Sequence, residues 1–279
     1  MKKNCVLCDS DTFNLIYDLG KYKIQRCSKC GLVRTFGEME ASYEHYHRDE
    51  EYASLDNYFR NIFQKRYNII VNCKFKIENS SKAGRVLDIG ASTGVMLDIF
   101  KSNGWETWGV EPSEAGKILR YKDIKILNTT FEKAKLPKNY FDVVIMNHTL
   151  EHVEDPIKVL KKIHQILKKG GIVYIDVPNF GSLSSHIAGR GWKFLHAYEH
   201  IHQFEPDTLK KCLQKAGFEI AWQGTWSGIF DVANPLLKFW QTLTGLKKQF
   251  FTDLIDIPGS IIATYLDRGT SLAMIGKKQ

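Results

Sequence analysis

The stretch "RVLDIGASTGVMLDIFKSNG", residues 85–104, decides the fold. Residues 86–89 predict a buried strand, "GASTG" (90–94) predicts a tight loop, and residues 95–102 predict a helix closed by Asn-Gly. The following "WETWGVEPS" predicts a second strand that ends at Glu111, an acid placed to accept hydrogen bonds from both hydroxyls of a ribose. A strand, a glycine loop, a helix and a strand ending in an acid predict the βαβ unit of a nucleotide-binding sheet.

Two other interpretations of the glycine loop were weighed. "GASTG" matches G-x-S-x-G, the nucleophile elbow of α/β-hydrolases, and it has the right strand-turn-helix context. An elbow strand should follow several earlier strands and an oxyanion loop, which the preceding sequence does not supply, and the elbow gives Asp88 and Glu111 no role. A dinucleotide site is disfavoured because G-x-G-x-x-G is absent.

The stretch "YFDVVIMNHTLEHVEDP" predicts another buried strand, 141–146, with Asn147 and His148 at its carboxyl end. Open parallel sheets bind ligands in the crevice beyond these ends. "HTLEH" also fits the H-x-x-E-H spacing of some zinc proteases, but that site needs both histidines on successive turns of one helix. Here the first histidine follows a strand directly and the next helix starts only at Asp155. We therefore interpret the segment as the rim of the crevice.

The remaining elements continue the same alternation. "DIKILNTTFEKAKLP" predicts a short strand and a loop, and "DPIKVLKKIHQILKKGG" predicts a helix that ends at Gly170-Gly171. "IVYIDVPN" predicts a fifth strand, "KCLQKAGFEIAWQGTW" a helix and a sixth strand, and "SLAMIGKKQ" a final strand. The fold class is therefore α/β.

Two C-x-x-C pairs stand near the start of the chain: Cys5, Cys8, Cys27 and Cys30. Two such turns joined by a hairpin complete a tetrahedral four-thiolate zinc site, and "FNLIYDL" and "YKIQRC" predict the hairpin strands. Two pairs at this spacing argue against a redox site. About forty residues bury too little apolar surface alone, so we expect a structural metal. Thiolates of this kind indicate a reducing cytoplasm.

The glycine loop, "GVEPS" and "NHTLEHVEDP" together resemble class I S-adenosylmethionine-dependent methyltransferases, over roughly residues 84–224 and the final strand. The resemblance is closest to the broad group that contains the ubiquinone-biosynthesis methyltransferases. It implies a Rossmann-like seven-stranded sheet whose last strand inserts antiparallel. It implies cofactor contacts at Asp88, Gly90, Ala91, Gly94, Glu111, Pro112, Thr130, Phe131, Asn147 and His148. For Thr130 and Phe131, an ordinary surface loop remains the alternative.

In this family the segment after the fifth strand usually covers the substrate, and here it is "GRGWKFLHAYEHIHQFEPDTL", 189–209. Methyl transfer is an in-line displacement on an activated cofactor, so the protein mainly aligns the reactants and excludes water. An alcohol acceptor also benefits from a base, and histidine has a suitable pKa. His200 is the first candidate, then His152, with His148 beside the methyl group. A metal cluster and simple packing stay open as alternatives for the cover's histidines.

The sequence divides into a zinc-binding module at 1–37, a helical linker or lid at 38–82 and a methyltransferase domain at 83–279. Residues 43–52, "YEHYHRDEEY", either form part of a lid over the substrate or precede a helix that packs on the main domain. The domain carries a helical insertion at about 227–268. Its apolar face at 234–257 predicts packing over the pocket, peripheral membrane contact or a dimer contact, so the oligomeric state stays unknown.

The function that these patterns predict is methyl transfer to a small-molecule or glycan acceptor, such as a nucleotide- or lipid-linked sugar. A ribosomal RNA methyltransferase with a zinc module is an alternative that the net charge of +8 suits. No dense Lys/Arg stripe with stacking aromatics is present, so a nucleic-acid partner is not expected. A non-catalytic zinc-bearing interaction protein is the third possibility. No signal peptide or spanning helix is expected, since no apolar run of about 18 residues occurs.

Overall fold

The computed structural model describes residues 4–38, 56–78, 83–113, 124–227, 262–263 and 265–279. The predicted lid at 43–52 and the insertion helix at 234–257 lie outside the described residues. Among the helices that are described, none has the length and apolar character needed to cross a membrane.

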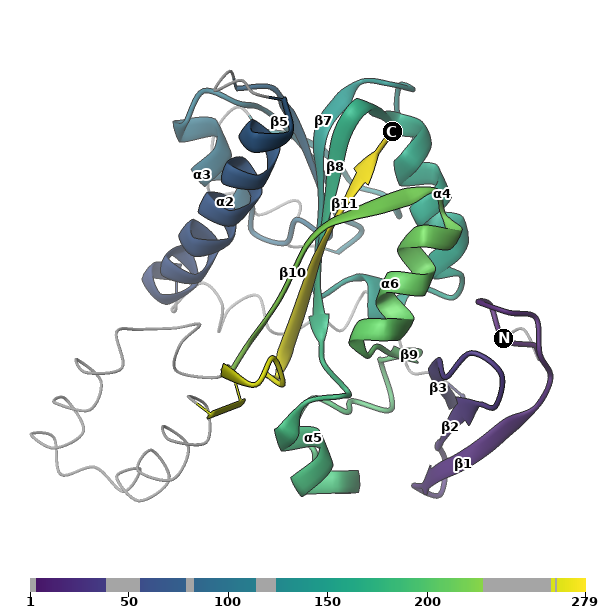
Figure 1. Cartoon of the computed structure of the whole chain (residues 1–279). Helices are drawn as coiled ribbons and strands as arrows, with labels where there is room; N and C mark the ends of the chain where they lie inside the picture. The colour runs from purple at the N-terminus through teal and green to yellow at the C-terminus, as the bar shows by residue number, and fades with distance from the viewer. Residues whose placement is uncertain (1–3, 39–55, 79–82, 114–123, 228–261, 264) are drawn as a thin grey trace, which may run out of the picture.

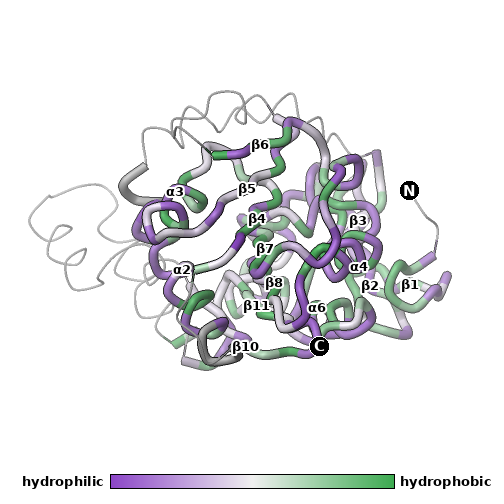
Figure 2. Tube along the Cα trace, turned by 90° about the horizontal axis from the view of Figure 1, so that it is seen from above, coloured by the Kyte–Doolittle hydropathy of each residue, from purple (hydrophilic) through white to green (hydrophobic). Residues whose placement is uncertain are grey.

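A seven-stranded sheet forms the centre of the molecule, in the order β10-β11-β8-β7-β4-β5-β6 (Figures 1 and 2). Its strands are β4 (Arg85–Ile89), β5 (Glu106–Val110), β6 (Lys125–Leu127), β7 (Phe141–Asn147), β8 (Leu167–Pro178), β10 (Phe218–Trp226) and β11 (Ser271–Lys278). Strands β4 to β8 are parallel, whereas β11 lies antiparallel between β8 and β10. The α/β sheet with an antiparallel last strand is therefore confirmed.

Helices cover both faces of this sheet (Figure 1). On one face lie α2 (Asp56–Glu78) and α3 (Val95–Ser102), and on the other α4 (Pro156–Ile166) and α6 (Pro206–Lys215). Alternate residues of β7 supply the two cores: Val143 and Ile145 pack on the α2/α3 side, Val144 and Met146 on the α4/α6 side. A strand buried on both faces explains its continuous apolar run.

The helix before β8 ends earlier than its sequence suggests. The pattern "ILKKGG" predicts continuation to Gly170, but α4 ends at Ile166 and β8 begins at Leu167. Leu167 is fully buried and pairs with Phe141 across the sheet, so burial in the sheet outweighs the remaining helical turn. Gly170, with φ +76°, lies in the irregular start of the strand instead.

A second, four-stranded sheet lies beside the carboxyl edge of the first (Figure 1). The predicted hairpin is present as β1 (Phe13–Asp18) and β2 (Lys23–Cys27). The sequence did not indicate β3 (Val33–Phe36) or β9 (His202–Gln203), the short strand that pairs with β3. Because β9 belongs to the segment predicted to cover the substrate, the N-terminal sheet is joined to that segment by backbone hydrogen bonds.

A buried ion pair fastens α2 to the carboxyl edge of the large sheet. Arg66 Nε donates to Asp176 Oδ2 at 2.8 Å, and their side chains are 3% and 0% exposed. The hydroxyls of Tyr174 and Ser271 donate to the same carboxylate, and the Arg66 guanidinium lies 4.0 Å from the ring centre of Trp226. Removing one partner of such a pair leaves an uncompensated buried charge.

We therefore expect Arg66→Ala to lower the free energy of unfolding by about 3 kcal/mol, measured by urea denaturation. Arg60→Ala on the same helix is the matched control. Arg60 pairs with Asp98 at 2.6 Å, but the two side chains are 40% and 22% exposed. Its loss should cost under about 1 kcal/mol. Equal effects of the two substitutions would contradict the difference in burial.

Candidate functional site

The carboxyl ends of four neighbouring parallel strands, β4 to β7, meet at one edge of the large sheet. The cofactor residues predicted from the sequence follow these ends. They are Asp88, Gly90, Ala91 and Gly94 on β4 and its loop, Glu111 and Pro112 after β5, Thr130 and Phe131 after β6, and Asn147 and His148 at the end of β7.

The glycine loop is fixed by its neighbours. Glu111 is buried, and its carboxylate accepts hydrogen bonds from Ser92 N–H at 2.8 Å and from Ser113 N–H at 2.9 Å. Gly90, at φ +80°, has no room for a side chain because a Cβ there would lie 2.5 Å from Thr149 Oγ1. The loop thus requires glycine at this position, both for its backbone conformation and for the close approach of Thr149.

Asp88 lies directly below the loop at the end of β4. It is 4% exposed, and its Oδ1 has no hydrogen-bond partner among the described residues. Burial, and then the negative charge of Glu111, raise its pKa to about 7. A buried carboxylate oxygen without a partner at the mouth of a nucleotide-type loop can accept a hydrogen bond from a ligand.

The loop after β6 provides one buried and one half-exposed residue. The Phe131 ring belongs to the core and lies 4.7 Å from the Lys162 ammonium, which donates to backbone carbonyls of 131, 132 and 134. Thr130 stays half-buried at the same edge. Lys162 on α4 therefore shapes this loop, although the sequence gave no reason to single it out.

The post-β7 loop and the cover segment meet around Glu151. Glu151 lies on a short 3₁₀ turn, Leu150–His152, and is 1% exposed. One of its oxygens, Oε1, is 3.5 Å from His148 Nδ1 and 4.0 Å from His152 Nε2. The centres of the His152 and His200 rings are 4.8 Å apart, and the centre of the His196 ring is 5.2 Å from that of His200. One rim of the crevice therefore holds all three candidate catalytic histidines, which are His148, His152 and His200.

The histidines of the rim differ in burial and in charged neighbours. Desolvation opposes protonation of His148, but the adjoining Glu151 carboxylate raises its pKa, and the side chain is 46% exposed. His200 is 6% exposed, and desolvation lowers its pKa to about 3. General bases work best with a pKa near the working pH, so burial weakens the case for His200 as the proton acceptor. His202, which also belongs to the cover segment, instead has its Nε2 3.4 Å from the backbone carbonyl oxygen of Glu154.

The four N-terminal cysteines converge as their spacing predicts. Their sulfur atoms all lie within 4.8 Å of one another, with Cys5 and Cys30 at 3.4 Å and Cys8 and Cys27 at 3.5 Å. Sulfurs around a tetrahedral zinc ion, with bonds of about 2.3 Å, are roughly 3.8 Å apart. The arrangement therefore fits a four-thiolate ion.

Contacts from the cysteine module reach the histidine rim. The Thr35 hydroxyl on β3 donates to His200 O at 2.7 Å, and Thr35 N–H donates to Ile201 O at 2.9 Å. On the other side, Ile201 N–H donates to Glu151 O at 2.9 Å. Arg26 on β2 forms a bidentate pair with Glu205 at 2.7 Å for both bonds. The backbone of the cover segment is thus held between the module and the post-β7 loop.

Sequence reasoning missed Thr35, Thr149 and Arg66. Thr35 and Arg66 act through pairings that are distant in the chain, which no local pattern reveals. Asp176 did carry a signal, because it is a charged residue inside the apolar run "IVYIDVP". Its backbone carbonyl accepts from His148 N–H at 2.8 Å, which holds His148 at φ +50°, a conformation rare outside glycine.

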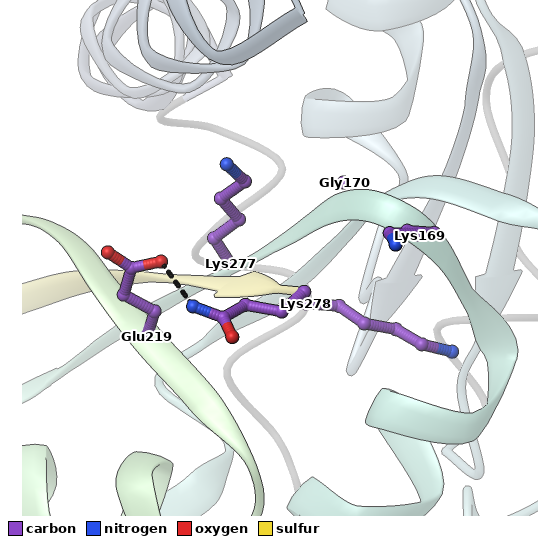
Figure 3. A pocket seen from close by; sticks show the side chains of 6 residues that line it. Lys169, Gly170, Glu219, Lys277 and Lys278 are labelled. Atoms are coloured by element: carbon purple, nitrogen blue, oxygen red, sulfur yellow. Dashed lines mark hydrogen bonds between the residues drawn. The ribbon is translucent and has the colours of Figure 1, made fainter.

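An open hollow also exists at the opposite edge of the sheet (Figure 3). It is lined by Lys169, Gly170, Glu219, Lys277, Lys278 and Gln279. Gln279 Nε2 donates to Glu219 Oε2 at 3.0 Å across it. Lys169 and Gly170 stand at the start of β8, so this hollow lies at the amino ends of the parallel strands. Ligands of such sheets bind at the other edge, and the glycine loop and histidines are there.

The sequence profile of the family described as "Methyltransferase domain" matches residues 45–222, well over half of the 279 residues. The chain belongs to this family. The match spans the glycine loop, Glu111 and the histidine rim. It ends within β10, before the antiparallel last strand.

A curated relative of this methyltransferase domain is the "Ubiquinone biosynthesis O-methyltransferase" of Rhodopseudomonas palustris. It is 29% identical over 170 residues, which cover 56% of this chain and 65% of the relative. The chain therefore spans slightly less than two thirds of that relative's length.

Solved structures share the fold. A Thermotoga maritima "SAM-dependent methyltransferase, possible histamine N-methyltransferase" superposes with a TM-score of 0.54 at 21% identity, covering 84% of this chain and 96% of that one. The Haemonchus contortus "Phosphoethanolamine N-methyltransferase 2" superposes with a TM-score of 0.57 at 17% identity, covering 88% and 62%. These likenesses confirm the Rossmann-like methyltransferase fold.

Proposed function

We propose that the chain transfers a methyl group from S-adenosylmethionine to a hydroxyl of a small-molecule or glycan acceptor. The observation that carries this proposal is the position of two features at one sheet edge. A glycine loop braced by Glu111 lies one strand away from the histidine rim, and the Asp88 Oδ1 below the loop has no hydrogen-bond partner in the part of the chain that the structure describes. The family match and the name of the curated O-methyltransferase relative support the reaction class.

The residues present fit S-adenosylmethionine. Glu111 would accept from the ribose hydroxyls, Asp88 Oδ1 offers an acceptor for the cationic methionine part, and Thr130 and Phe131 flank the adenine side. Asn147 and His148 border the reacting methyl. When bound, the cofactor supplies a methyl group already activated on a sulfonium. The protein's tasks are then to orient the acceptor and to exclude water.

The acceptor would lie between the post-β7 loop and the cover segment. An imidazole from this rim would take the hydroxyl proton, and His200, His152 and His148 are the candidates. The His148 side chain is 46% exposed, whereas Glu151 and His200 are buried, so His148 is the most accessible of these groups to an acceptor. We further propose that zinc bound by Cys5, Cys8, Cys27 and Cys30 is structural, because four thiolates leave no open position.

A methyl-transfer screen tests the function. Full-length chain is incubated with S-adenosylmethionine carrying a labelled methyl group and with nucleotide-sugars, lipid-linked glycans, phenolic small molecules and RNA in parallel. We expect label in a hydroxyl-bearing small molecule or glycan. Label in RNA alone, or no binding of the cofactor at millimolar concentration by calorimetry, would overturn the proposal.

Asp88 should make stability depend on pH. Its pKa rises from 3.8 to about 7 on folding, so between pH 4 and 7 the unfolded chain gives up this proton while the folded chain keeps it. Stability is therefore lost as the pH rises through this window, by roughly 4 kcal/mol in full. We expect Asp88→Asn to gain stability relative to wild type between pH 5 and 8 in urea unfolding.

The same variant separates folding from ligand binding. A cationic cofactor favours the charged carboxylate, so wild-type affinity for S-adenosylmethionine should rise with pH toward 7, and that of Asp88→Asn should not. A constant stability difference between wild type and variant at pH 5 and pH 8 would contradict the raised pKa.

A further inference from the structure

A second group of metal-binding side chains lies at the histidine rim, far in the sequence from the cysteines. One ligand atom each of Glu151, His152 and His200 lies within 4.8 Å of the others. Two imidazoles and one carboxylate with open positions form a recurrent site for divalent transition metals. We propose that Glu151, His152 and His200 bind one such ion, of the Zn²⁺, Fe²⁺ or Co²⁺ type, in addition to the four-cysteine ion.

The first argument is the carboxylate. Glu151 is 1% exposed, and neither of its oxygens accepts a hydrogen bond from the described residues. The nearest imidazole nitrogens, on His148 and His152, are 3.5 and 4.0 Å away, beyond the usual length of a hydrogen bond. A buried carboxylate needs a compensating partner, and a divalent ion supplies the charge and takes up the free lone pairs.

The second argument is the tautomer of His152. Its Nδ1 lies 3.2 Å from the backbone carbonyl of Glu199, which can only accept, so Nδ1 carries the proton. The other ring nitrogen, Nε2, lies 4.0 Å from Glu151 Oε1, which is longer than a hydrogen bond. An ion at this position would be ligated by both atoms. An imidazole N–H held by a backbone carbonyl is also the common outer partner of a metal-bound histidine.

The third argument is His200. It is 6% exposed, and its Nδ1 has no hydrogen-bond partner among the described residues. Its backbone is fixed from both sides, by Thr35 on β3 and by the neighbouring Ile201–Glu151 hydrogen bond. Ligand atoms around a tetrahedral ion with bonds of about 2.0–2.1 Å are roughly 3.4 Å apart. Side-chain rotations that move the ligand atoms by about 1 Å would therefore bring them to bonding distance of one ion.

The ion would join the post-β7 loop to the cover segment, next to the rim where the acceptor is proposed to bind. Imidazole nitrogens favour transition metals over Mg²⁺, whose preferred ligands are oxygens. Any role in methyl transfer rests on the proposed function, whereas metal binding itself does not.

Cobalt loading of the full chain tests the proposal. A four-thiolate Co²⁺ site gives an intense sulfur-to-metal charge-transfer band, and a nitrogen- and oxygen-ligated ion does not. We expect about two equivalents of Co²⁺ per wild-type chain by elemental analysis. Glu151→Gln and His200→Gln should each lose one equivalent and keep the thiolate band, which also reports that the variant is folded. His164→Gln, a half-buried histidine packed on Phe218, is the matched control and should keep both.

A single equivalent of Co²⁺ in the saturated wild type would overturn the proposal. Retention of the second equivalent by both rim variants would overturn it too. S-adenosylmethionine affinity, measured by calorimetry on the same samples, separates the two hypotheses. Normal cofactor binding with a single metal refutes only the metal site, and absent cofactor binding refutes the methyltransferase.

Discussion

Glu111→Ala is expected to weaken S-adenosylmethionine binding by about 100-fold in calorimetry, since lost hydrogen bonds to a charged group are worth roughly 1.5–3 kcal/mol. The buried carboxylate has two tasks. It would receive the ribose hydroxyls, and it already accepts from Ser92 N–H in the glycine loop and from Ser113 N–H behind it. The substitution therefore removes a ligand contact and also releases the loop that contacts the rest of the cofactor.

The same strand supplies the matched control. Glu106 stands at the start of β5, at the opposite edge of the sheet, and its half-exposed carboxylate contacts Arg85, Lys125 and Trp108. Glu106→Ala should keep the cofactor dissociation constant within about twofold, because surface ion pairs contribute little and none of these partners reaches the site. If Glu111→Ala bound the cofactor as tightly as wild type, the assignment of Glu111 to the ribose hydroxyls would be wrong.

Much of the fold was predictable because its signals are local. The residues from Val86 to Ser102 form the strand, loop and helix at the predicted positions, since an apolar run, two glycines and an amphipathic turn each dictate a conformation within a few residues. The boundary between α4 and β8 was wrong. There, pairing of Leu167 with Phe141 in the sheet decides where the helix ends, and a helical pattern does not contain that information.

The cofactor part of the site was predictable because the carboxyl ends of parallel strands meet at one edge of the sheet. Placing Asp88, Glu111 and Asn147 after parallel strands was enough to bring them to one edge. The partners of His200 were not predictable, because Thr35 is 165 residues away in the chain and meets it only through the pairing of β3 with β9. Likewise, no local pattern shows that Glu151 is buried among three histidines, because that burial results from packing of the cover segment.

Disruption of the proposed four-cysteine metal site should affect catalysis more than cofactor binding. We expect Cys27→Ser to lower the methyl-transfer kcat on the order of 100-fold, the penalty typical of a misplaced catalytic group, with the cofactor dissociation constant within about twofold. A module of this size that binds a structural ion would need that ion to fold, so β3 should lose its order without it. Strand β3 holds the cover segment through β9 and through Thr35, whereas the glycine loop and Glu111 make no contact with the module among the hydrogen bonds described.

Variants at two further positions test whether the loss of kcat comes from the contacts of β3 with the cover segment. Cys73→Ser replaces a half-buried thiol on α2, outside the four-cysteine group, and should leave both kcat and the cofactor dissociation constant near wild type. Thr35→Val keeps the size of the side chain but removes the hydroxyl that donates to His200 O, so it should lower kcat while Thr35→Ser, which retains the hydroxyl, restores most of it. If Cys27→Ser instead lost cofactor affinity and kcat together, the module would support the whole domain. If it changed neither, the contacts of β3 with the cover segment would have no part in placing the histidine rim.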